Sequence, residues 1–150
     1  MIYLLLILYQ IKHFVCDFPL QTPWMLGKFK KYPDFVLPLL CHAATHGVAT
    51  FLIAFCFNTK SALWLALFDM GMHFTVDRVK ASPSLLGRFK ALSGNEMKAI
   101  LSYEPTLPPG DFKLKFGDQL KSNTYFWWAL GADQAVHHLT HYFIIWRILS

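Results

Sequence analysis

Ten histidines and aspartates recur at a spacing of four residues inside the most apolar parts of the chain. They form four sets: His13 with Asp17, His42 with His46, Asp69 with His73 and Asp77, and Asp133 with His137 and His141. Residues four apart in an α-helix lie on one face, with a drift of about 40° per step. Imidazoles and carboxylates are ligands of zinc, manganese and iron. The spacing therefore predicts four helices that each turn a polar face towards a shared metal site.

Four apolar segments must position these side chains. They cover roughly residues 2–18, 35–57, 61–78 and 124–149, and about 20 helical residues are needed to cross a bilayer. The chain is 55% hydrophobic and only 15% charged, which exceeds what the core of a soluble domain needs. We predict an all-α fold, a polytopic membrane four-helix bundle, with residues 1–150 forming a single transmembrane domain.

The basic residues gather in two of the expected loops. The loop at 19–34 carries Lys28, Lys30 and Lys31, and the loop at 79–123 carries Lys80, Arg88, Lys90, Lys98, Lys113, Lys115 and Lys121. The positive-inside rule places both loops in the cytoplasm and both termini outside. A net charge of +5 next to apolar runs favours anionic membrane lipid as the partner, and not nucleic acid.

Two further patterns fit a membrane protein. In the long loop, Leu85, Leu86, Phe89 and Leu92 could share one face of a helix that has Arg88 and Lys90 on the other, which predicts an amphipathic interfacial segment between the third and fourth helices. Tryptophans stand near the ends of the expected spans, as in an aromatic belt; they are Trp24, Trp64, Trp127, Trp128 and Trp146.

Charged side chains inside a bilayer need partners, because each costs about 2.5–3.5 kcal/mol at the bilayer centre. Four carboxylates could balance two divalent ions, and helix bundles are known to hold such dinuclear sites. We predict that one or two ions of zinc, manganese or iron bind to His13, Asp17, His42, His46, Asp69, His73, Asp77, Asp133, His137 and His141. The alternative for any single pair is a hydrogen bond that ties two helices together.

Some neighbouring polar residues have weaker patterns. His138 breaks the four-residue spacing, and we expect it to pack beside the site or to support it. Gln21, Gln134 and Lys80 stand at helix edges, where they could hold the ligands or simply face the interface. The three cysteines show no spacing typical of a disulfide framework or a zinc ribbon.

The ordered motifs resemble a known family. They are His-x-x-x-Asp-Phe-Pro-Leu-Gln at 13–21, His-x-x-x-His at 42–46, His-x-x-x-Asp-x-x-Lys at 73–80 and Asp-Gln-x-x-His at 133–137. This set resembles the small membrane proteins of phages and bacteria grouped as domain-of-unknown-function family 3307. The resemblance implies an integral protein of the bacterial inner (cytoplasmic) membrane, and it brings no known activity with it.

The predicted site suggests three functions. The first is a membrane-embedded metal-dependent hydrolase that acts at the cytoplasmic face on a lipid or lipid-linked phosphoester. In this reading His141 and Asp133 are catalytic, His141 as general base or ligand, and Lys80 or Arg88 receives an anionic headgroup. The second is a non-enzymatic protein, an ion or proton pathway or a binder of a host membrane partner, with a structural metal site. The third is a di-iron lipid oxidase, suggested by His-His-Leu-Thr-His at 137–141. The chain could also form a homo-oligomer.

Overall fold

The computed structural model describes residues 1–57, 59–82, 85–86 and 124–150. These residues form four α-helices: α1 (Ile2–Asp17), α2 (Val36–Cys56), α3 (Ala62–Ala81) and α6 (Thr124–Leu149). A short 3-10 helix, η1 (Met25–Phe29), lies between α1 and α2. The described residues contain no strand, which confirms the all-α prediction for this part of the chain. Helix α3 runs three residues beyond the expected end at 78, and so it carries Lys80 within the helix.

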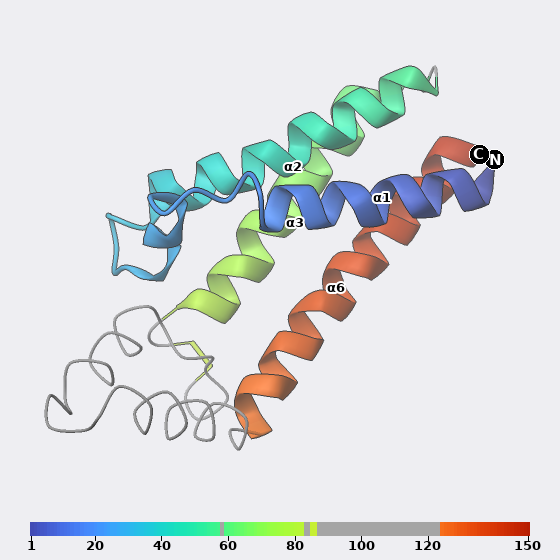
Figure 1. Cartoon of the computed structure of the whole chain (residues 1–150). Coiled ribbons are helices and arrows are strands. Elements are labelled where there is room, and N and C mark those ends of the chain that lie inside the picture. Colours follow the sequence, from blue (N-terminus) through green and yellow to red (C-terminus); the bar gives the residue numbers. More distant parts are fainter. Residues whose placement is uncertain (58, 83–84, 87–123) are drawn as a thin grey trace, which may run out of the picture.

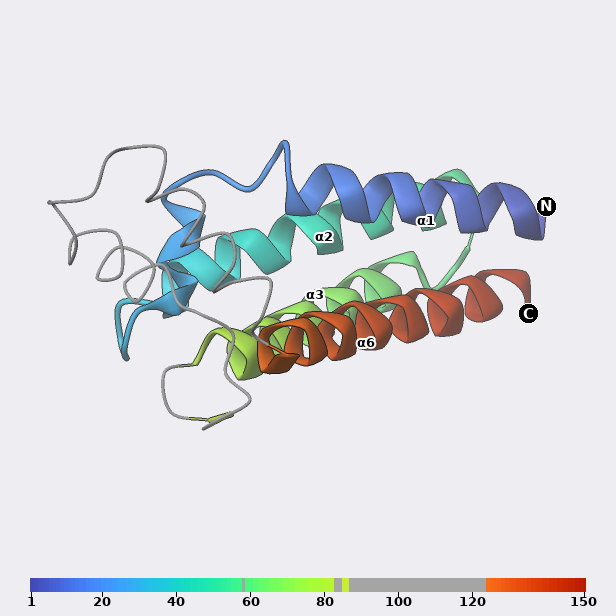
Figure 2. The same ribbon diagram turned by 60° about the horizontal axis from the view of Figure 1, so that its bottom comes forward.

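The helices alternate in direction along the bundle. Figures 1 and 2 show the N-terminus of α1 and the C-terminus of α6 side by side at one end, with η1 and the last turn of α3 at the opposite end. Helices α2 and α3 make the most extensive pairing. Short connections between antiparallel neighbours are typical of helix bundles.

One stripe of each helix faces the bundle interior, and its character changes along the bundle. Near the termini the buried residues are apolar; they are Leu5, Tyr9, Ala54, Ala62, Leu65, Ile144 and Ile145. Towards the other end, the same stripes carry histidine, aspartate and lysine. The apolar half is an ordinary hydrophobic core, and the polar half requires a separate explanation.

A glycine lets α2 and α3 approach closely beside the polar half. A Cβ atom added at Gly47 would lie 3.0 Å from the Ala66 carbonyl oxygen and 3.1 Å from Met70 Cβ. Backbone atoms cannot move aside easily, so a larger residue here would force the helices apart. The close approach lets His46 of α2 stack on His73 of α3, with 3.6 Å between the ring centroids.

The outer surface of the bundle carries large apolar side chains. Among the exposed ones are Ile7 and Phe14 on α1, Leu52 and Phe55 on α2, and Leu67 on α3. By length and composition, one helix in the described part of the chain, α2, is apolar enough to cross a membrane. The amphipathic segment expected at 85–92 falls mostly outside the described residues, as does Arg88.

Candidate metal centre

The interior of the polar half brings together side chains from all four long helices. The ten residues predicted from the sequence all lie there, and every one except the partly exposed Asp17 is buried; they are His13, Asp17, His42, His46, Asp69, His73, Asp77, Asp133, His137 and His141. Four groups of three have ligand atoms within 4.8 Å of one another. Their roles as metal ligands remain predictions.

Asp17, at the end of α1, lies among three imidazoles. Its Oδ1 is 3.1 Å from His46 Nε2 and 3.4 Å from His42 Nε2, both on α2. Its Oδ2 is 3.2 Å from His13 Nε2, one turn earlier on α1. In the described part of the chain, every ion pair of Asp17 is with a histidine.

Two other aspartates are paired with lysines. Lys28, on η1, donates from Nζ to Asp77 Oδ2 at 2.7 Å. Lys80 Nζ donates to Asp133 Oδ2 at 2.7 Å and lies 3.5 Å from Asp77 Oδ1. His137 Nε2 is 3.5–3.6 Å from both carboxylates. These ammonium groups already supply the positive charge that a metal would bring to this group.

Asp69 also has a lysine partner, contributed by α1. Lys12 Nζ donates to Asp69 Oδ2 at 2.5 Å, and Thr50 Oγ1 donates to the same oxygen at 2.6 Å. The Lys12 and Asp69 side chains are 2% and 0% exposed. Charges buried this completely persist only when they are paired and hydrogen-bonded.

Sequence reasoning missed the roles of Lys12 and Lys28. Lys28 was expected as a basic loop residue facing the cytoplasm, but it is buried and bonded to Asp77. Lys12 is a lysine within an apolar segment, on the same helix stripe as Tyr9, His13 and Cys16. The position of Lys12 in the sequence could have predicted its pairing with an aspartate, because a lysine on the buried face of a helix needs a carboxylate partner.

Among the described residues, the lysines leave one carboxylate of the cluster, that of Asp17, without an ammonium partner. Asp69, Asp77 and Asp133 each bond to a lysine, so three positive charges face four negative ones when the histidines are neutral. One more positive charge at Asp17 would balance the four carboxylates. Either a metal ion or a protonated histidine could supply it there.

The spacing around Asp17 suits a metal ion. Ligand atoms bound about 2.0–2.2 Å from a tetrahedral zinc ion lie about 3.3–3.6 Å from each other. The two distances from Asp17 Oδ1 to the imidazole nitrogens of α2, 3.1 and 3.4 Å, are close to this range. Three protein ligands with a fourth position left for water are typical of catalytic zinc sites.

Glutamines and a histidine surround the centre. Gln134 donates from Nε2 to Asp133 Oδ2 at 3.1 Å, and its Oε1 lies 3.1 Å from His13 Nε2. His13 Nε2 therefore carries a proton that points at oxygen acceptors, so His13 orients Asp17 through that atom. Gln21 donates to the Asp17 carbonyl at 2.8 Å. His138 lies 3.2 Å from Gln10 at the edge of the cluster.

His73 has the arrangement of an oriented base. Its Nδ1 lies 3.1 Å from the Asp69 carbonyl oxygen, which can only accept a hydrogen bond. The proton is therefore on Nδ1, and Nε2 keeps a lone pair. That Nε2 is buried and has no hydrogen-bond partner. A ring nitrogen of His73 lies within 4.8 Å of ring nitrogens of His13 and His46.

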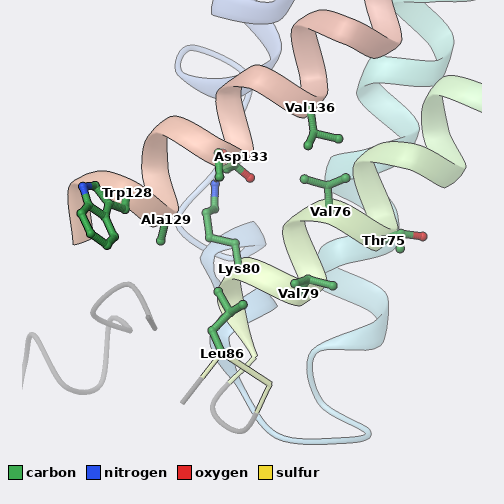
Figure 3. Close-up of a pocket in the computed structure, with 10 residues that line it drawn as sticks. Thr75, Val76, Val79, Lys80, Leu86, Trp128, Ala129, Asp133 and Val136 are labelled. Carbon is green, nitrogen blue, oxygen red and sulfur yellow. The ribbon is translucent and has the colours of Figure 1, made fainter. Parts of the chain in front are cut away.

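A cavity adjoins the cluster between α3 and α6. It has a volume of about 410 Å³. Figure 3 shows Lys80 reaching from α3 to Asp133 on α6, between aliphatic side chains of both helices. The apolar part of the lining includes Val76, Val79, Ala129, Ala132 and Val136.

The Lys28–Asp77 pair gives the first testable prediction. Replacing Lys28 with methionine leaves Asp77 buried with one ammonium partner fewer, so we expect Lys28→Met to lower the free energy of unfolding by about 3 kcal/mol. Adding Asp77→Asn should recover part of this loss. Denaturant unfolding in detergent micelles measures both, with the exposed Lys31→Met as control. Equal stability of the Lys28 and Lys31 variants would contradict the pairing.

Comparisons with known proteins identify the family. A model of the family described as protein of unknown function (DUF3307) matches residues 4–149, nearly the whole chain. A search of curated proteins found no match, and neither did a search of solved structures. The match includes every residue of the candidate metal centre and all of the four helices except the first two residues of α1. The chain therefore belongs to domain-of-unknown-function family 3307.

Proposed function

We propose that the chain is a membrane-embedded metal-dependent hydrolase that holds one divalent ion at Asp17, His42 and His46. The observation that carries this proposal is the environment of Asp17. In the described residues it is the one aspartate of the cluster that has imidazoles and no lysine within ion-pair distance. Both imidazole nitrogens of α2 stand at ligand spacing from its Oδ1.

Charge favours one ion over two. With three ammonium groups and four carboxylates, the cluster lacks one positive charge. One divalent ion would bring the net charge of the cluster close to zero, whereas two divalent ions would leave it strongly positive in a medium that solvates charge poorly. The same charge balance disfavours a di-iron oxidase, because such an enzyme holds two metal ions.

The chemistry would be hydrolysis of a phosphoester. A divalent ion at the centre supplies an activated water. His73 Nε2 accepts the proton of that water, the water oxygen bonds to phosphorus, and the phosphorus–oxygen ester bond breaks. The imidazolium of His73 then returns the proton to the leaving oxygen. His73 suits this role better than His141, because His141 Nε2 faces the Lys12 ammonium at 3.3 Å.

The distribution of side chains supports a membrane location. Large apolar residues cover the outside of the helices, while Lys12, Lys28, three of the four aspartates of the cluster and six of the seven histidines are buried between them. Such an arrangement suits hydrocarbon as solvent. The five tryptophans are all about half exposed, as side chains of an interfacial belt would be. Lys30 and Lys31 remain exposed at the η1 end, which we assign to the cytoplasmic side of a bacterial inner membrane.

The cavity between α3 and α6 supports a lipid substrate. Its aliphatic walls suit a hydrocarbon chain, and its polar edge at Lys80 and Asp133 joins the cluster through His137. Binding sites for small molecules are often apolar with a few polar groups that fix orientation. We therefore propose a lipid or lipid-linked phosphoester as substrate.

Metal content tests the centre. We expect about one zinc, manganese or iron ion per purified, detergent-solubilised chain, and a loss of at least tenfold in affinity in Asp17→Asn and in His46→Ala, because each removes a ligand. His138→Ala lies at the edge of the cluster and should keep the ion. Elemental analysis beside circular dichroism measures this. A folded wild-type chain without metal would remove the proposal and leave an imidazolium as the missing charge.

His73 separates catalysis from binding. We expect His73→Gln to keep the metal ion but to lower the turnover of a phospholipid phosphoester by about 10²–10⁴-fold, the range for a lost general base. Product release from phospholipid vesicles, followed by chromatography, measures the rate. If the metal-loaded wild-type chain produces no product from any phospholipid, the non-enzymatic alternative with a structural ion replaces the hydrolase.

Labelling of single cysteines tests the topology. In a chain whose three native cysteines are replaced by alanine, we expect a membrane-impermeant thiol reagent applied to intact cells to label Ser150→Cys. Lys31→Cys should react only after the cells are opened, because it follows η1, which lies at the other end of the bundle from the C-terminus (Figure 1). Labelling of both positions in intact cells, or of neither, would contradict the proposed orientation.

A further inference from the structure

A second set of metal-type ligands lies deeper in the bundle than Asp17. It consists of Asp69 and His73 on α3 and His141 on α6, all 0% exposed. Asp69 Oδ1 is 3.2 Å from His73 Nδ1 and 3.9 Å from His141 Nε2. One carboxylate and two imidazoles at these distances form the same ligand set as Asp17, His42 and His46.

An ammonium group takes the position of a cation in this second set. Lys12 Nζ lies 2.5 Å from Asp69 Oδ2 and 3.3 Å from His141 Nε2. Tyr9 is one turn earlier on α1, and its buried hydroxyl has no hydrogen-bond partner. In the part of the chain that the structure describes, the ion pairs of Asp17 include no such lysine.

We propose that Lys12 is a built-in cation that fills a second metal-binding set, Asp69, His73 and His141, and so limits the chain to one ion. The proposal rests on the proposed function, because it explains why only the Asp17 set binds metal. The ligand class of the second set, once Lys12 is removed, is a divalent ion such as zinc.

Because Asp69 is buried, binding of a divalent ion becomes favourable once the Lys12 ammonium is removed. Without the ammonium, a fully buried carboxylate would keep only Thr50 as a donor to its Oδ2, and its Oδ1 already lacks a hydrogen bond. Removing one partner of such a pair leaves an uncompensated charge. A divalent ion with two imidazole ligands at hand restores the balance.

The lysine also protects the proposed base. A metal ion bound at Asp69 would draw His73 into its ligand shell and displace the hydrogen bond that fixes the proton on Nδ1. With Lys12 in place, Asp69 is neutralised and His73 Nε2 stays free. Lys12 is therefore a positioning residue for His73.

Metal stoichiometry tests the proposal. The full chain is purified in detergent, loaded with zinc, passed through a desalting column and analysed for zinc per chain. We expect one ion in the wild type, two in Lys12→Met, and one in Lys12→Met with Asp69→Asn. Lys12→Arg keeps the charge and should hold one ion, as should Lys60→Met, whose lysine is exposed outside the helices.

A folded Lys12→Met chain that holds no more zinc than the wild type would overturn the proposal. If Lys12→Met folds poorly, the unfolding temperature of Lys12→Gln is measured with and without zinc. An increase on adding zinc that is larger than the increase in the wild type supports the proposal. An equal increase in both chains overturns it. One ion in both wild type and Lys12→Met leaves the proposed function intact. No ion in the wild type with one in Lys12→Met removes the Asp17 centre but retains the Lys12 inference.

Discussion

Four aspartates lie between the helices, where water has little access to them, and each needs a positive charge nearby within the protein. Lysines from α1, from η1 and from α3 itself satisfy three of the four. A carboxylate left alone in such an interior would destabilise the bundle by several kcal/mol. The arrangement of helices, the position of η1 and the cluster of histidines around Asp17 all follow from this requirement. The metal ion proposed at Asp17 would supply the remaining positive charge.

The connection between α1 and α2 shows how the requirement shapes the fold. Lys28 holds η1 against Asp77, and Arg78 donates to the carbonyl oxygens of Lys28 and Lys30 at 3.2–3.4 Å. The Arg78 guanidinium also covers the Phe35 ring at 3.5 Å. The segment before α2 is therefore tied to the last turns of α3, at the end of the bundle where Asp17 and Lys80 are the most exposed members of the cluster. Substrate would enter at this end.

The sequence was informative about the helices and the polar faces, because both depend on local periodicity. The four-residue spacing of His13, Asp17, His42 and His46 was enough to place these side chains on helix faces, and the apolar segments were enough to predict an all-α fold. The lysine partners were harder to predict. Lys12 and Asp69 are 57 residues apart, so their contact depends on how α1 docks against α3. Charge counting from sequence alone suggested up to two ions, whereas the structure sets three lysine ammonium groups against the four carboxylates.

The proposed metal ion at Asp17 is tested most directly by anomalous diffraction. Crystals of the detergent-solubilised chain are grown with zinc, and data are recorded on both sides of the zinc absorption edge. We expect one strong peak per chain in the anomalous difference map, about 2.0–2.2 Å from the Asp17 carboxylate and from the Nε2 atoms of His42 and His46. A map without a peak there, or with the peak between Asp69, His73 and His141, would contradict it.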